Sequence, residues 1–89
     1  MEFCKGELVM CIAGREKDRL MCVIGYDGKF VYVCDGKERP LNNPKRKNPK
    51  HVVKTDKKLS DNMFLTDRAL RKALSKEVSQ LFVNTLDMA

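Results

Sequence analysis

Apolar residues fall in short runs through the first half of the chain, each bounded by glycine, proline or charged residues. These runs are rich in β-branched and aromatic residues, and such runs between turn residues predict β-strands. We expect an antiparallel meander with strands at 7–12, 19–26, 29–34 and 37–41. A fifth short run at 51–55 is expected to return and pair with the first strand, which would close the sheet.

Two Asp-Gly pairs, Asp27-Gly28 and Asp35-Gly36, separate the expected strands. Asp-Gly is a preferred pair in type I′ hairpin turns, so the sequence predicts two tight hairpins. Gly25 lies inside the second run, where a glycine predicts a bulge or bend. The pattern therefore favours a small, curved sheet.

After residue 65 the apolar residues recur at the spacing of an α-helix. Thr66 is a candidate N-cap and Asp67 would suit the first turn. Apolar residues then recur on one helical face, at Leu70, Ala73, Leu74, Val78 and Leu81. We expect a helix over about 66–80 that packs on the sheet. The expected single core comprises Leu8 or Val9, Val23, Val31, Val33, Val53, Leu70 and Leu74.

The net charge of +6 is concentrated in one segment. Residues 36–58 hold nine Lys or Arg against two acids, a net of +7, so the remainder sums to about −1. Within this segment, 42–50 has no apolar residue except proline and is expected to be an exposed basic loop. The sequence thus divides into a barrel at 1–58, which includes this loop, and a helical extension at 59–89 that packs on it.

The sequence lacks the patterns typical of metal-binding, catalytic, membrane-spanning and secreted proteins. The four cysteines form no C-x-x-C pair and His51 is the one histidine, so we expect reduced cysteines and no metal site. No paired carboxylates or nucleophile–base spacing points to catalysis, and we expect no enzyme, cofactor or small-molecule substrate. No apolar run is long enough to span a membrane, and the first residues lack a secretory pattern, so a cytoplasmic protein is expected.

The segment 13–19 (AGREKDR) lies between the first two expected strands and holds three basic residues around Gly14. Basic side chains displayed at the rim of a small sheet suit a phosphate backbone. The candidate RNA-binding residues are Gly14, Arg15, Lys17, Arg19, Lys45, Arg46, Lys47, Lys50 and His51. Aromatic residues are few, and we expect most of them in the core.

These features together resemble a known family. Gly6, Leu8, Val9 and the 13–17 turn, followed by an apolar strand and an Asp-Gly hairpin, resemble a KOW motif. The basic 44–50 segment, His51 and the 71–74 helix sequence (RKAL) are similar to bacterial KOW-domain RNA-binding proteins related to the large-subunit ribosomal protein fourteen-e.

The resemblance implies an SH3-like barrel that binds RNA, usually ribosomal RNA or the ribosome, without catalysis. Asp18 stands where the family commonly has glycine, and aspartate tolerates the left-handed conformation better than most residues. The expected function is recognition of structured RNA by shape. The alternative is an adaptor that docks on ribosomal or transcription proteins.

Overall fold

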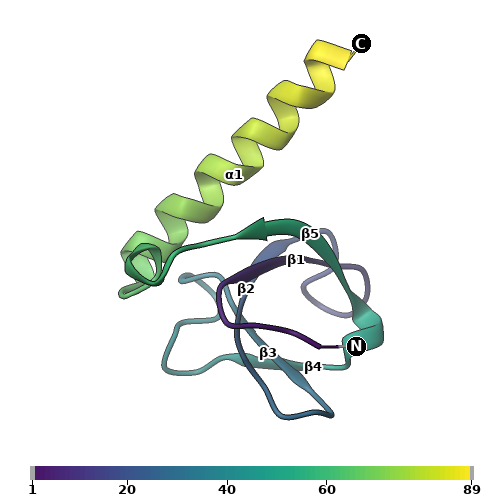
Figure 1. Ribbon diagram of the computed structural model, residues 1–89, viewed down its shortest axis with the longest axis vertical. Coiled ribbons are helices and arrows are strands. Elements are labelled where there is room, and N and C mark those ends of the chain that lie inside the picture. Colours follow the sequence, from purple (N-terminus) through teal and green to yellow (C-terminus); the bar gives the residue numbers. More distant parts are fainter. Residues whose placement is uncertain (1, 89) are drawn as a thin grey trace.

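The computed structural model describes the backbone of residues 2–88 and the side chains of residues 2–80. Five antiparallel strands form one curved sheet, and a single α-helix follows them (Figure 1). The strands are β1 (Glu7–Cys11), β2 (Leu20–Tyr26), β3 (Val31–Cys34), β4 (Lys45–Lys47) and β5 (Val52–Lys58). Short 3-10 helices η1 (Pro49–His51) and η2 (Asp61–Met63) precede β5 and the helix α1 (Asp67–Met88). The expected mainly β class with a C-terminal helix is confirmed.

The strand order in the sheet is β4-β3-β2-β1-β5. The fifth strand therefore returns to pair with the first, as expected, with Cys11 opposite Val52. The two edge strands β4 and β5 do not pair with each other, so the sheet is curved but open. The register between β2 and β3 shifts between Val23 and Gly25, which confirms the expected bulge.

The expected strand at 37–41 is wrong, because its backbone groups are used elsewhere. The carboxylate of Asp35 accepts hydrogen bonds from the amides of Lys37 and Arg39, which curls this segment into a turn. The Leu41 amide donates to the carboxylate of Asp67 at 2.7 Å.

The fourth strand is instead β4, which lies inside the segment expected to be a loop. An edge strand needs only backbone pairing with β3, so a run of three basic residues can form it.

Neither Asp-Gly pair forms a type I′ turn. That turn needs positive φ at both central residues, and only the glycines have it, at 90° for Gly28 and 77° for Gly36. Asp27 instead precedes its turn and accepts hydrogen bonds from the amides of Lys29 and Phe30. These bonds, with one from the Tyr32 hydroxyl, lower the pKa of the Asp27 carboxyl.

The sheet is buried on both faces, which makes two apolar clusters instead of the single expected core. Alternation along β1 sends Leu8 and Val9 to opposite faces, yet both are buried. The inner cluster, enclosed by the curved sheet, comprises Phe3, Val9, Cys11, Met21, Val23, Val31, Val33 and Val52. The outer cluster lies under α1 and η2 and comprises Leu8, Leu20, Cys22, Cys34, Leu59, Phe64, Leu70 and Leu74. Val53, expected in the core, is 50% exposed, because the pairing of β5 turns Val52 inward in its place.

The helix packs on the sheet through its first two turns. The Thr66 hydroxyl accepts a hydrogen bond from the Ala69 amide, which confirms Thr66 as the N-cap. Leu70 and Leu74 are buried, whereas Val78 is 49% exposed, and the side chain of Leu81 lies outside the described residues. α1 is longer than expected and its C-terminal part extends beyond the sheet (Figure 1). In the described part of the chain, no helix is long and apolar enough to span a membrane.

Three of the four cysteines are buried in these clusters, and all four are free thiols. Burial raises the pKa of Cys22 to about 11 and that of Cys34 to about 12, and it also raises the pKa of Cys11. Because the thiolate is the reactive form, we expect a neutral alkylating reagent at pH 8 to label the folded protein once, at Cys4. All four thiols should react in denaturant, as read by intact mass. Rapid labelling of a second thiol in the folded state would contradict this packing.

Candidate nucleic-acid interface

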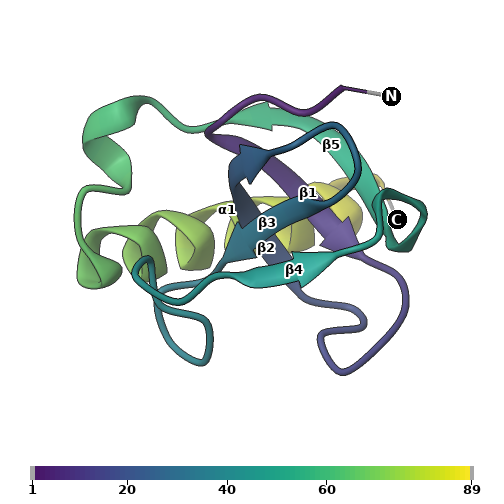
Figure 2. The ribbon, with the colours of Figure 1, turned by 90° about the horizontal axis from the view of Figure 1, so that it is seen from below.

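The loop between β1 and β2 lies beside the segment that joins β4 to β5. The Ile12 amide donates to the carbonyl of His51 at 2.9 Å, and the Lys47 ammonium donates to the carbonyl of Ala13 at 2.8 Å. Figure 2 shows this loop and η1 at the same end of the sheet. Two basic segments that are far apart in sequence, 12–19 and 45–51, therefore form one surface, which we call the basic end.

The 12–19 loop is held in a fixed backbone conformation. Asp18 donates its amide to the carbonyl of Cys11 at 2.8 Å, and Lys17 donates to the carbonyl of Gly14 at 3.2 Å. Gly14 has a φ of 84° and Asp18 one of 70°, so Asp18 adopts the left-handed conformation that aspartate tolerates better than most residues. The ordered backbone presents the side chains of Arg15 and Lys17 to solvent.

Glu16 is the anchor of this loop, and it points into the protein. Its side chain is 3% exposed, and its carboxylate lies 3.3 Å from Nε of Arg39 and 4.0 Å from Nζ of Lys47. Neither carboxylate oxygen has a hydrogen-bond partner among the described residues. We call Glu16, Arg39 and Lys47 the buried ion cluster. Because Glu16 belongs to the loop and Lys47 to β4, their ion pair ties the two segments of the basic end together.

Lys47 is not the exposed cation that the sequence predicted. Alternation along β4 places it on the same face as Val31, and its side chain is 5% exposed. The ammonium of Lys47 fills the space beside Gly14, since a Cβ added at Gly14 would lie 2.8 Å from Lys47 Nζ. Lys47 thus supports the loop from inside. The expectation that 42–50 is wholly an exposed loop is wrong for this residue.

Arg19 has carboxylate partners of its own. Its guanidinium donates two hydrogen bonds to Glu38, at 2.6 and 3.2 Å, and lies 3.9 Å from Asp35. The hydrogen bonds to Glu38 raise the pKa of Arg19, and the same bonds lower the pKa of Glu38. Arg19 is exposed, but a phosphate would have to compete with Glu38 for it.

The other candidate cations remain available at the basic end. Arg46 and Lys50 are exposed, as is His51, while Lys45 is half-buried at the edge of the sheet. In the part of the chain that the structure describes, no carboxylate lies within ion-pair distance of these residues or of Arg15 and Lys17. The Arg46 guanidinium instead lies over the ring of Phe30, with its Cζ 4.6 Å from the ring centroid.

The sequence indicated no role for Glu16 or Arg39, and Phe30 was one of the few aromatic residues, most of which were expected in the core. The acid in the middle of a basic loop gave no sign of being buried, because no local period applies to a loop. The strand pattern could have indicated the position of Phe30. Side chains alternate along a strand, so Phe30 and Tyr32 share one face of the sheet while Val31 and Val33 share the other. Four further exposed cations lie on α1, at Arg68, Arg71, Lys72 and Lys76.

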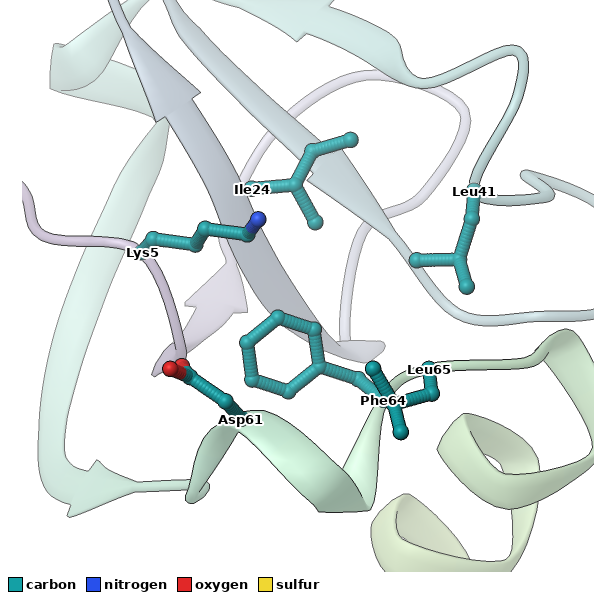
Figure 3. A pocket seen from close by; sticks show the side chains of 6 residues that line it. All are labelled: Lys5, Ile24, Leu41, Asp61, Phe64 and Leu65. Carbon is teal, nitrogen blue, oxygen red and sulfur yellow. The ribbon is translucent and has the colours of Figure 1, made fainter.

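A separate apolar hollow of about 460 Å³ lies beside η2 (Figure 3). Its lining comprises Lys5, Ile24, Leu41, Asp61, Phe64 and Leu65. The side chain of Leu65 is the most exposed of the large apolar ones described, at 73%.

No group of three or more potential metal-ligating side chains occurs among the described residues. No protein-family model matches the chain, and a search of curated proteins finds no match.

Proposed function

We propose that this protein is a non-enzymatic RNA-binding module that grips structured RNA, such as ribosomal RNA, through the basic end. The observation that supports this most strongly is the gathering of Arg15, Lys17 and Lys50 on one surface without carboxylate partners among the described residues. Cations left unpaired on an ordered backbone can neutralise phosphates and release their counterions.

We further propose that the sheet belongs to the SH3-like barrels of KOW type. A meander of four strands, followed by a 3-10 helix and a fifth strand that pairs with the first, supports this assignment. The 12–19 loop, with Gly14 and Asp18 both at positive φ, supplies the corresponding turn. Its fixed shape would give Arg15 a defined position from which to bind phosphate in a bidentate manner.

A salt titration of RNA affinity tests the proposal. We expect the combined Arg15→Ser, Lys17→Ser and Lys50→Ser variant to bind an RNA hairpin more weakly. Its slope of log affinity against log salt should fall by about 0.7–0.9 for each phosphate that the variant no longer neutralises. None of these side chains is buried, so the free energy of unfolding should change little.

A matched control distinguishes this surface from general positive charge. The combined Arg68→Ser, Lys72→Ser and Lys76→Ser variant removes the same charge from α1 and should leave most of the affinity and slope in place. Equal losses in the two variants would mean that net charge, not the basic end, drives binding. That result would contradict the proposal.

The hollow beside η2 favours a second candidate, an adaptor for another protein. Exposed Leu65 and the apolar lining would receive an apolar side chain, with Lys5 and Asp61 at one side of the Phe64 ring (Figure 3). The two candidates differ in a simple way. An adaptor would remain in its complex after nuclease treatment and would be weakly sensitive to salt, whereas an RNA-dependent complex would dissociate.

A further inference from the structure

Three planar side chains lie together where β3 pairs with β4. The register puts Tyr32 opposite Arg46, on the face of the sheet away from Val31 and Val33. Phe30 adjoins them, because the Arg46 guanidinium lies 4.6 Å from its ring centroid. We call Phe30, Tyr32 and Arg46 the planar patch.

The patch differs from the aromatic packing elsewhere in the protein. Phe3 and Phe64 are 6% and 5% exposed and belong to the apolar clusters, whereas Phe30 and Tyr32 remain partly exposed outside both clusters. The sequence-based expectation that most aromatic residues are core therefore does not hold for these two. Arg46, the third member, is exposed.

The planar patch is also held in place before any ligand arrives. The Tyr32 hydroxyl donates to Asp27 at 2.8 Å, and the same carboxylate accepts the amides of Lys29 and Phe30. Gly25 lies opposite Tyr32 and has no side chain to cover its ring. Fixed rings lose little conformational entropy when a flat ligand stacks on them.

We propose that the planar patch stacks an unpaired base of the RNA whose phosphates the basic end binds. Aromatic rings and guanidinium planes are the groups on which unstacked RNA bases lie in protein complexes. Val31 pairs with Lys47, so Phe30 lies beside the end of β4, where the chain continues into η1 with Lys50 and His51. The patch therefore adjoins this part of the basic end. The inference rests on the proposed function, and it narrows the ligand to structured RNA with a bulge, loop or single-stranded flank.

Two RNAs test this inference: a fully paired, blunt-ended duplex, and the same duplex with a single 2-aminopurine added to one strand as a bulge. The test variant is Arg46→Lys, which keeps the charge but removes the planar group. We expect it to bind the bulged RNA about tenfold more weakly and the paired RNA almost as well as the parent. Stacking should also quench 2-aminopurine fluorescence with the parent protein and not with the variant.

A second variant and a control keep the test sharp. Phe30→Leu keeps an apolar side chain without a ring and should cause the same selective loss. Lys72→Arg, on the exposed basic face of α1 and outside the basic end, should change neither affinity. An equal loss for both RNAs, or an unquenched bulge with the parent, would overturn the stacking proposal while leaving the proposed function in place. Failure of the parent protein to bind either RNA would overturn both.

Discussion

Replacing Gly36 with alanine is expected to destabilise the protein by about 2–6 kcal/mol, as the sum of backbone strain and overpacking. Gly36 has a φ of 77°, and an added Cβ would lie 2.3 Å from the carbonyl oxygen of Asp67, at the start of α1. That contact is with backbone, so relief requires the helix to move away from the sheet. Urea denaturation followed by circular dichroism measures the loss.

Gly28→Ala is the matched control for this substitution. Gly28 has a φ of 90°, but nothing lies within 4 Å of the position of an added Cβ. The control therefore carries only the backbone strain of positive φ, about 1–2 kcal/mol. If the two variants lost the same stability, the close approach of Gly36 to the first turn of α1 would not exist.

Replacing Glu16 with alanine is expected to cost about 3–5 kcal/mol, because removal of one partner leaves a buried charge uncompensated. Lys47 would keep its hydrogen bond to Ala13 but would lose the carboxylate that balances its ammonium. Arg39 is 26% exposed and can recover water, so most of the cost falls on Lys47. The same urea titration measures it.

A double variant separates the charge effect from the loss of packing. Glu16→Leu combined with Lys47→Met replaces both buried charges by apolar side chains of similar volume, and such replacements are often close to neutral. We expect the double variant to be more stable than Glu16→Ala. A Glu16→Ala protein as stable as the parent would show that the buried ion cluster does not hold the 12–19 loop.

The apolar runs predicted much of the sheet, because strands buried on one or both faces leave a clear pattern. β1, β2 and β3 lie within the expected runs, and the return of β5 to β1 was also expected. β4 was missed because an edge strand of Lys45, Arg46 and Lys47 carries no apolar signal. Its pairing comes from backbone groups of β3, which no side-chain pattern reveals.

The sequence predicted which residues the candidate site contains better than it predicted which way their side chains point. Arg15, Lys17 and Lys50 are exposed on one end, as the charge pattern suggested. The buried position of the Lys47 ammonium depends on its ion pair with Glu16, which lies 31 positions earlier in the chain. An ion pair over such a separation is a tertiary contact, so neither local propensity nor charge counting could have found it.

The most direct test of the proposed RNA surface is an amide chemical-shift titration of the labelled protein with a fully paired RNA duplex. We expect the shifts to concentrate on the 12–19 loop and on Lys50 and His51. The amides of the exposed basic face of α1, at Arg68, Lys72 and Lys76, should hardly move. Shifts confined to α1 or to the hollow around Phe64, with the 12–19 loop unmoved, would contradict it.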